Sequence, residues 1–191
     1  MNIELATPLG AWTRDADLVR RAQGGELAAF ELLIRQRLDR LFRIACGVLG
    51  NPTDAEDATQ EACIAAWQKL PTLRDIDRLD AWLGRIVVNA CRMRLRERRR
   101  VREITLDDER AKASREIPDP SQMATRAEDV DAVGRALDRV SVDDRALLIL
   151  HHVHHERVET IAATLGIPAG TVKWRLSRAR HAVQRALEGE R

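Results

Sequence analysis

Residues 170–180, GTVKWRLSRAR, place four cationic side chains and one aromatic side chain in a stretch of helix-forming composition. Guanidinium and ammonium groups bind phosphates, and an arginine can also donate two parallel hydrogen bonds to the edge of a guanine. Val172 and Leu176 are four residues apart, so on a helix both would face a core and leave Lys173 and Trp174 on the other side. The segment is a candidate for contacting DNA, with a basic helix at the end of a bundle as the alternative.

The residues just before this stretch predict how it is held. In VETIAATLGIPA, residues 158–169, Ile161 belongs to a short apolar face. Gly166 suits the left-handed residue that ends a helix, and Pro168 suits the start of the next helix. The pattern predicts a helix, a tight turn and a second helix from about Ala169. This is a helix-turn-helix, whose second helix can enter a major groove.

A second basic stretch lies earlier in the chain. Between Arg85 and Arg102 there are eight arginines and one acidic residue, Glu97. Such a density of positive charge indicates a surface that binds a polyanion. Residues 103–130 have the opposite balance, with 8 acidic and 4 basic side chains. Because prolines and the absence of helical periodicity accompany these acids, we expect a flexible, mostly extended linker over residues 103–127.

An acidic face precedes the arginines, in DAEDATQEACIAAWQKL at residues 54–70. Asp57, Gln60 and Glu61 have i, i+3 and i+4 spacing and would share one side of a helix. Two carboxylates and an amide can pair with arginines on a partner helix. The alternative is a solvated acidic face, which the helix dipole favours near an N-terminus.

The stretch HHVHH, residues 151–155, raises a metal-binding alternative, because His151 and His155 have the spacing of paired zinc ligands on a helix. Histidines equally suit the C-terminal end of a helix, and the role of this group, which also contains His152 and His154, is left open. Three cysteines lie far apart and predict buried thiols, not a disulfide framework or a metal site: Cys46, Cys63 and Cys91. No nucleophile, base and acid arrangement or phosphate-cradling glycine loop predicts an enzyme.

The composition, 45% hydrophobic and 32% charged over 191 residues, is typical of a globular protein. The sequence has no run long enough to cross a membrane and no signal segment within residues 1–30, so we expect a cytoplasmic protein with no membrane partner. Periodicity predicts an all-α fold. We expect helices at these approximate bounds: 15–23, 27–49, 53–70 with a Thr53/Glu56 capping box, 80 into the arginines, 128–140, 143–153 with a weaker Ser141/Asp144 capping box, and the helix-turn-helix.

Four segments together resemble one family: GELAAFELLIRQ, DAEDATQEACIAAWQKL, AWLGRIVVNACRMRLRERRR and ETIAATLGIPAGTVKWRLSRARHAV. Their order and spacing are similar to those of bacterial RNA polymerase sigma factors of the extracytoplasmic-function group. The resemblance implies two helical domains, region 2 in residues 1–102 and region 4 in residues 128–191. It also implies a promoter-specificity subunit whose partners are core RNA polymerase and promoter DNA, with an anti-sigma factor left open as a further partner.

The resemblance assigns roles to individual positions. Core polymerase, through the clamp helices of its largest subunit, would meet Asp57, Gln60 and Glu61, and the flap of the second-largest subunit would meet the second domain. The −10 element would lie against Trp82, Arg85, Asn89, Arg92, Arg94, Arg96, Arg98, Arg99 and Arg100, with Asn89 helping to hold a flipped base. The −35 element would be contacted by Thr171, Lys173, Trp174, Arg175, Ser177, Arg178 and Arg180.

Two positions depart from the family's pattern. Gly84 stands where an aromatic residue is common, so one stacking or packing surface is missing. Trp174 stands where a small serine is usual, which changes what the second helix of the helix-turn-helix can contact in the groove. Two other functions stay open at this point. One is a stand-alone helix-turn-helix regulator, and the other is a His-dependent metal sensor. The interpretation we favour includes no cofactor, no metal and no catalytic residue.

Overall fold

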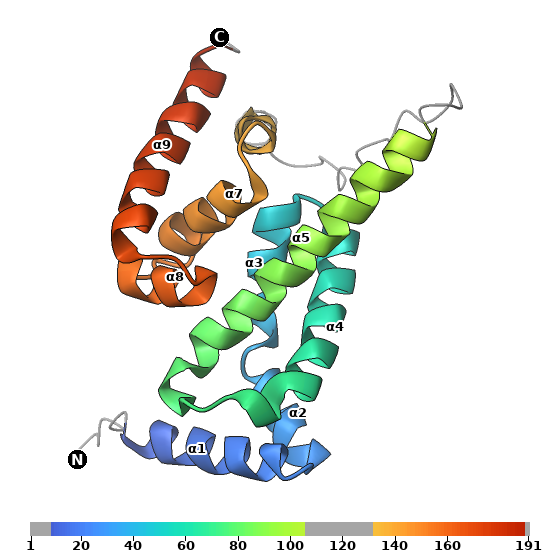
Figure 1. Ribbon diagram of the computed structural model, residues 1–191, viewed down its shortest axis with the longest axis vertical. Coiled ribbons are helices and arrows are strands. Elements are labelled where there is room, and N and C mark those ends of the chain that lie inside the picture. The colour runs from blue at the N-terminus through green and yellow to red at the C-terminus, as the bar shows by residue number, and fades with distance from the viewer. Residues whose placement is uncertain (1–8, 106–131, 190–191) are drawn as a thin grey trace, which may run out of the picture.

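The computed structural model describes residues 9–105 and 132–189, and throughout these residues the ordered elements are helices, with no strand (Figure 1). The long helices are α1 (Leu9–Gln23), α2 (Leu27–Arg35), α3 (Leu38–Leu49), α4 (Pro52–Lys69), α5 (Leu79–Thr105), α7 (Val142–Leu148), α8 (Val158–Leu165) and α9 (Ala169–Glu188). Short turns of helix are η1 (Leu70–Thr72), η2 (Ile76–Arg78) and the π-helix η3 (Ile149–Val153). Residues 132–138 are also helical. The all-α prediction is confirmed.

The first domain, residues 9–105, is built around α3, α4 and α5, which contact one another in pairs. The buried side of α4 is lined with small side chains, so the two neighbouring helices can approach it closely. Those residues are Ala55, Ala58, Thr59, Ala62 and Ala66. Helix α5 buries Leu83 and Val87 on its inner side, and its polar side stays available for other contacts.

The predicted helix over residues 27–49 is wrong in one respect, because the chain breaks between α2 and α3 at Gln36 and Arg37. The hydrophobic periodicity continues across the break, so nothing local signals it. Arg37 forms ion pairs with Asp15 of α1 and Asp80 of α5 and donates to the Leu33 carbonyl at 3.1 Å. These contacts hold the side chain at the junction of three helices, and the sequence alone does not reveal them.

The start of α4 also differs from the expected Thr53/Glu56 capping box. Asn51 is the N-cap, and its Oδ1 accepts from the Asp54 backbone N–H at 3.0 Å. Pro52 occupies the first helical position, where its missing N–H costs nothing. The helix therefore begins one residue earlier than predicted. Ser141 does cap α7 as predicted, with its Oγ accepting from the Asp144 N–H at 3.1 Å.

The second domain contains the helix-turn-helix, formed by α8 and α9. Gly166 ends α8 with φ of 68°, in the left-handed region that glycine adopts without steric cost. Val172 and Leu176 of α9 are buried, with 0% and 2% of their surface exposed. The predicted turn and the predicted core face of the second helix are both confirmed.

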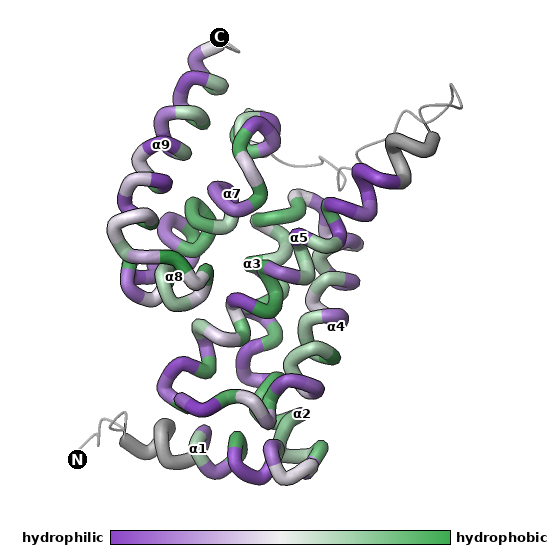
Figure 2. The backbone as a smooth tube through the Cα atoms, in the orientation of Figure 1, coloured by the Kyte–Doolittle hydropathy of each residue, from purple (hydrophilic) through white to green (hydrophobic). Residues whose placement is uncertain are grey.

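The two domains lie against each other, with α8 beside α5 and α7 beside α3 (Figure 1). One continuous cluster of buried apolar side chains includes Ile44 and Val87 of the first domain and Leu150 and Ile161 of the second. Figure 2 shows that the C-terminal part of α5 leaves this core and is mostly hydrophilic. The predicted linker lies outside the described residues except for its first three, which continue α5.

Candidate functional site

The acidic face of α4 is turned toward α5. The Asp57 carboxylate forms an ion pair with Arg94, and Glu61 lies 3.8 Å from the same guanidinium. Asp54, one turn earlier, lies 2.7 Å from Arg98 and 3.6 Å from Arg94. The carboxylates predicted to bind the polymerase and two arginines predicted to bind DNA therefore neutralise each other in this structure.

Gln60 occupies a different side of α4 from that ion-pair network. Its exposed side chain lines an open groove of about 460 Å³ between α3 and α4, with Leu38 and Phe42 forming the apolar wall. Leu38 is 44% exposed, which is unusual for a leucine near a core. The three residues predicted to share one surface are therefore divided, with Gln60 in the groove between α3 and α4 and the two carboxylates on the side of α4 that faces α5.

A hollow of about 290 Å³ lies at the N-terminal end of α5. Trp82 and Arg85 line it, as predicted for residues that meet DNA, together with Arg74 and Arg78 from the preceding loop. Ala163 of α8 contributes to the wall from the other domain. Three guanidinium groups and an indole around one hollow suit a nucleotide, since cations bind its phosphate and an aromatic ring can stack on its base.

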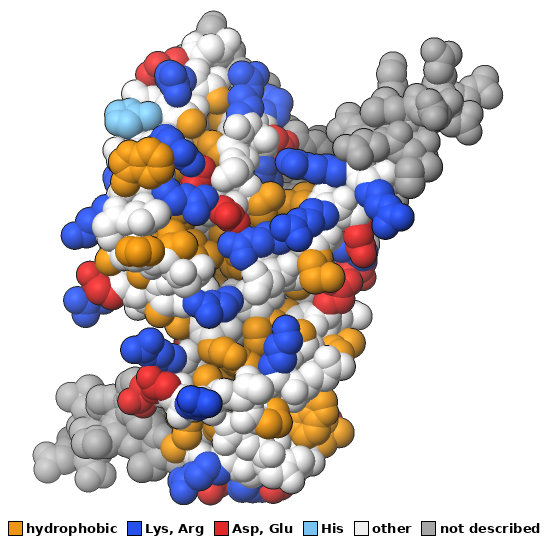
Figure 3. All heavy atoms as spheres, in the orientation of Figure 1, with side chains coloured by type: hydrophobic (Ala, Val, Ile, Leu, Met, Phe, Trp, Pro, Cys, Tyr) orange, Lys and Arg blue, Asp and Glu red, His pale blue; other side chains and the backbone are white. Residues whose placement is uncertain are grey.

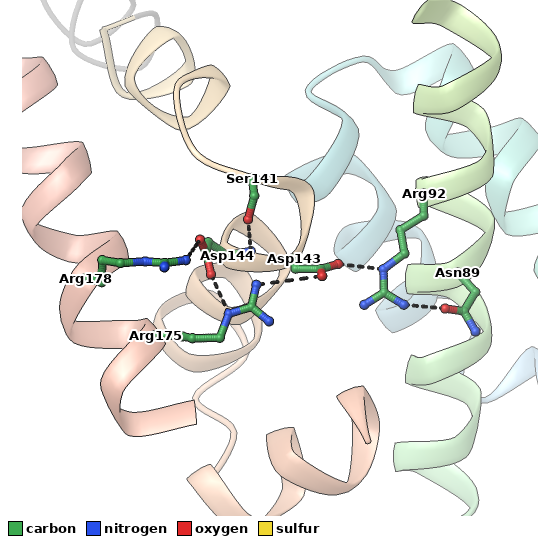
Figure 4. A network of polar contacts seen from close by, with 7 residues as sticks. All are labelled: Asn89, Arg92, Ser141, Asp143, Asp144, Arg175 and Arg178. Carbon is green, nitrogen blue, oxygen red and sulfur yellow. Dashed lines mark hydrogen bonds and ion pairs between the residues drawn. The ribbon is translucent and has the colours of Figure 1, made fainter. Parts of the chain in front are cut away.

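Asn89 and Arg92 lie farther along α5, one to two turns beyond that hollow. The Asn89 Oδ1 accepts from Arg92 at 2.5 Å, and the Arg92 Nε lies 2.6 Å from the Asp143 carboxylate of α7. Figure 4 shows the resulting chain of contacts, which continues from Asp143 to Arg175 of α9. The Asn89 amide NH₂ stays on the surface of the helix and can donate to a base edge.

The arginines at the end of α5 face solvent. Those with exposed side chains are Arg96, Arg98, Arg99 and Arg100. Figure 3 shows Lys and Arg side chains spread over this face of the molecule from α9 to α5, with acidic side chains set among them. The basic surface predicted from the sequence is therefore present, and it extends over both domains.

Four of the residues predicted to meet the −35 element form one exposed side of α9: Lys173, Trp174, Ser177 and Arg178. Trp174 is 60% exposed, and the Arg178 guanidinium carbon lies 4.6 Å from the centre of its ring. This geometry is a cation–π contact, which restricts both side chains. The indole and the guanidinium consequently present one joint surface toward any groove that α9 enters.

The buried carboxylate of Asp144 of α7 binds two arginines of α9. Its carboxylate accepts from the Arg175 Nε and from the Arg178 Nη2, each at 2.8 Å, while only 5% of the residue is exposed. Burial raises the pKa of this carboxyl, but hydrogen bonds from Arg178, Ser141 and Arg175 outweigh burial and hold the pKa below its ordinary value. Arg175 is therefore a structural residue of the second domain, and Arg178 is oriented from inside it.

The two remaining predicted residues of α9 lie at its flanks. Thr171 is half-buried in the first turn, and Arg180 is exposed with its Nε donating to the Leu176 carbonyl at 3.3 Å. Both side chains can reach phosphates beside a groove without pointing into its floor.

The histidine stretch does not form the helical pair that a zinc site needs. His155 lies beyond η3 with φ of 52°, and His151 contacts the Glu156 carbonyl at 3.2 Å. Within the described ranges, no group of three or more His, Cys, Asp or Glu side chains is arranged to hold a metal ion. Of the three cysteines predicted to be buried, Cys91 is buried, and burial raises the pKa of its thiol to about 12, whereas Cys46 and Cys63 are only half-buried.

Sequence reasoning missed the acids of α7 and the arginines of the loop before α5. The contacts of Asp143 and Asp144 with arginines could not be predicted, because two acids in a first helical turn are common. Arg74 and Arg78 belong to no periodic pattern. Their charge was the only signal, and it gains meaning only when the fold brings them beside Trp82 and Arg85.

Comparisons with known proteins agree with this arrangement. Residues 33–101 match the family Sigma-70 region 2, and residues 131–183 match the family Sigma-70, region 4. The ECF RNA polymerase sigma factor SigM of Mycobacterium tuberculosis is 34% identical over 173 residues, which cover 91% of this chain and 84% of SigM. The RNA polymerase sigma-H factor of Pseudomonas aeruginosa is 30% identical, with 92% and 94% of the two chains covered.

Two solved structures have the same fold. CnrH, in complex with the cytosolic domain of CnrY, matches with a TM-score of 0.65 and 26% identity over 93% of this chain and 99% of that one. The sigma factor RpoE of Bartonella quintana, in complex with the anti-sigma factor NepR, matches with a TM-score of 0.64 and 29% identity over 85% and 98%. The two matched regions and this fold define the class of the protein as a sigma factor. This chain belongs to the extracytoplasmic-function family of RNA polymerase sigma factors and is an alternative sigma factor.

Proposed function

We propose that this sigma factor binds core RNA polymerase through the groove and acidic edge of α4, opens and holds −10 DNA along α5, and binds the −35 duplex with α9. The observation that carries the proposal is the presence of two separate basic helices in one chain, one inside a helix-turn-helix and one beside an arginine-lined hollow. A single DNA-binding module needs only the first of these.

Polymerase docking is supported by the combination of apolar and charged groups around α4. Leu38 and Phe42 offer an apolar groove, and Gln60 offers both a donor and an acceptor inside it. Asp57 and Glu61, on the side of α4 that faces α5, suit arginines of a partner helix. A clamp helix of the largest polymerase subunit would fill the groove and compete with Arg94 for these carboxylates. The flap of the second-largest subunit would bind the second domain.

Promoter opening is supported by the α5 side chains. The guanidinium groups along the helix would bind the backbone phosphates of a single strand. Trp82, Arg74 and Arg78 around the hollow would receive a nucleotide, and the Asn89 amide would contact a base edge one turn farther on. Recognition of the −35 element would rest on Lys173, Ser177 and the stacked pair of Trp174 and Arg178.

Described residues 9–105 and 132–189 contain no helix that is both long enough and apolar enough to span a membrane. We propose that the protein acts in the cytoplasm, where the polymerase and the chromosome are, and has no catalytic activity of its own. The complex of the similar RpoE structure with the anti-sigma factor NepR supports an anti-sigma factor as a further partner.

The test of polymerase docking is the double variant Asp57→Ala with Gln60→Ala, measured in a titration against core polymerase. We expect weaker binding, because both the charged edge and the groove lose a partner. Glu159→Ala removes an exposed acid of α8 outside the groove and serves as the control. Unchanged affinity of the double variant, with unchanged circular dichroism, would remove α4 from the docking surface.

In vitro transcription from a promoter library, with and without the protein, separates this function from that of a stand-alone regulator. A sigma factor makes core polymerase start at selected promoters, whereas a regulator binds duplex DNA specifically without polymerase. The alternative is disfavoured because it leaves the α4 groove and the arginines of α5 without a role.

A further inference from the structure

The tryptophan of the second domain lies on the surface. Trp174 of α9 is 60% exposed, whereas Trp67 and Trp82 of the first domain are half-buried and pack against the core. Its indole shares one side of α9 with the exposed side chains of Lys173 and Arg178. The free surface of the ring therefore belongs to the side that α9 would turn toward DNA.

Arg178, one helical turn after Trp174, is held at two points. Its guanidinium carbon lies 4.6 Å from the centre of the indole ring, and its Nη2 donates to the Oδ2 of Asp144 at 2.8 Å. A long surface side chain loses rotamer freedom when it is ordered against a ligand, and these contacts already order it in the free protein. The bond to Asp144 uses one of the five N–H groups of a guanidinium, which leaves donors for both O6 and N7 of a guanine.

The carboxylate of Asp144 is itself fixed in place. Only 7% of this side chain is exposed, and its Oδ1 accepts from the Arg175 Nε at 2.8 Å. Its backbone N–H donates to the Oγ of Ser141. Figure 4 shows both arginines of α9 directed at this one carboxylate. Asp144 is too deeply buried to contact DNA, so it can act on recognition only through the arginines that it holds.

The chemistry of the stacked pair defines what it can read. On the base edges of a major groove, a guanine presents two acceptors, O6 and N7, and a thymine presents the apolar C5-methyl group. The guanidinium of Arg178 matches the acceptors, and the carbon surface of Trp174 matches the methyl group. Because the two side chains are in contact with each other, they would reach neighbouring base pairs.

We propose that Trp174 and Arg178 act as one reading unit, positioned by Asp144, and that this unit selects a thymine methyl group next to a guanine in the −35 duplex. Trp174 and Arg178 determine the specificity, and Asp144 is a positioning residue. The inference rests on the proposed function of α9 and names the base groups that α9 recognises.

The experiment uses holoenzyme formed from core polymerase and the full chain. A −35 sequence is selected from a randomised promoter library, and each of its thymines is then replaced singly by uracil, which lacks only the methyl group. At one thymine next to a guanine, the wild type should bind the uracil promoter about fourfold more weakly, the effect of one buried methyl group. Trp174→Ala should bind the two promoters equally. Replacing the guanine by 7-deazaguanine, which lacks the N7 acceptor, should weaken binding of the wild type but not of Arg178→Ala.

Asp144→Asn tests the positioning role, because asparagine keeps the volume of the side chain but not the charge that holds two guanidinium groups. Both affinity ratios, thymine over uracil and guanine over 7-deazaguanine, should fall toward one. A ratio of affinities for two promoters does not change when part of the protein is unfolded, so a loss of stability alone leaves it unmoved. Asp143→Asn removes the same charge from the adjacent residue, which pairs with Arg92 and Arg175, and this matched control should keep both ratios.

A Trp174→Ala holoenzyme that still discriminates thymine from uracil would overturn the methyl contact, and so would a wild type that accepts uracil at every position. Wild-type ratios in Asp144→Asn would overturn the positioning role. A holoenzyme that selects no −35 sequence would refute the proposed function of α9 and this inference together. A selected sequence for which the three variants keep the wild-type ratios would refute the inference alone.

Discussion

The two basic helices of this sigma factor differ in what holds their arginines. On α9, Arg175 and Arg178 are held by Asp144, which belongs to the same domain. On α5, Arg85 and Arg92 are held by groups of the other domain. The α9 surface therefore keeps its shape wherever the second domain goes, whereas α5 changes its partners when the domains separate. Similar charge in a sequence thus conceals one basic surface held by its own domain and one held by the neighbouring domain.

The strongest test of this contrast is Asp144→Ala. Removing a buried carboxylate leaves Arg175 with only its 3.7 Å contact to Asp143, and breaking a buried pair costs about 3–5 kcal/mol. Because Arg178 is half exposed, we expect about 2–3 kcal/mol of lost unfolding free energy, measured by chemical denaturation. Glu159→Ala removes an exposed acid of α8, paired at 3.8 Å, and should change little. An Asp144→Ala protein as stable as this control would show that the arginines of α9 do not need Asp144 to hold them.

The pH dependence gives the same carboxyl a second signature. Its pKa lies below the ordinary value in the folded protein, so the stabilisation is fully present above the unfolded pKa of about 3.9. It is lost as the pH falls through the folded pKa. The unfolding free energy of the wild type, measured by chemical denaturation, should therefore fall as the pH drops below about 4. The Asp144→Asn protein should lack the part of this decrease that protonation of Asp144 causes.

A second test asks whether the α9 surface reads bases. Arg178→Ala should relax −35 preference by about 1–2 kcal/mol at one base pair, because a bidentate guanine contact is worth that much. Arg180→Ala should weaken binding to all sequences and lower the salt slope by about one unit. Selection of promoter variants at two salt concentrations separates these outcomes. The reverse pattern would show that the helix enters the groove on another side.

The smallest effect is expected for Asp143→Asn, which releases Arg92 and removes the 3.7 Å contact with Arg175 of α9 while leaving Asp144 in place. Both side chains are partly exposed, at 39% and 27%, so the pair is worth about 0.5–1 kcal/mol. Binding of single-stranded DNA should tighten a few-fold. Glu159→Gln makes the same change in charge within the second domain and serves as the control. Equal tightening of DNA binding by the two variants would show that the effect comes from the loss of one negative charge and not from the release of Arg92.

Local signals in the sequence predicted the parts of the fold that they determine. Gly166 and Pro168 fixed the helix-turn-helix, and Ser141 fixed the start of α7, because turn and cap residues act within a few positions. The break between α2 and α3 lies at Arg37, whose ion-pair partners are 22 and 43 residues away in the sequence. No local pattern carries that information. The start of α4 was missed for a simpler reason, since Asn51 is a good cap that competed with Thr53.

The candidate site divides in the same way. Helical spacing correctly gathered Lys173, Trp174 and Ser177 on one exposed face. It did not reveal that Arg175 turns inward, because the acid that holds it is 31 residues earlier. Nor did it explain Gly84, where the sequence shows only that an aromatic residue is absent. The structure shows Thr164 packed against this glycine.

The contacts between the domains also bear on how the chain folds as it is synthesised. They join residues 51 to 116 positions apart, whereas each helix forms from neighbours, so docking is the slow, late step. The first domain is complete in sequence at Thr105, but the helices that cover it begin at Val142. At roughly 5–20 residues per second, α5 stays uncovered for seconds on the ribosome. A newly made chain therefore exposes the side of α5 that contacts α8 in the folded protein until synthesis has passed α8.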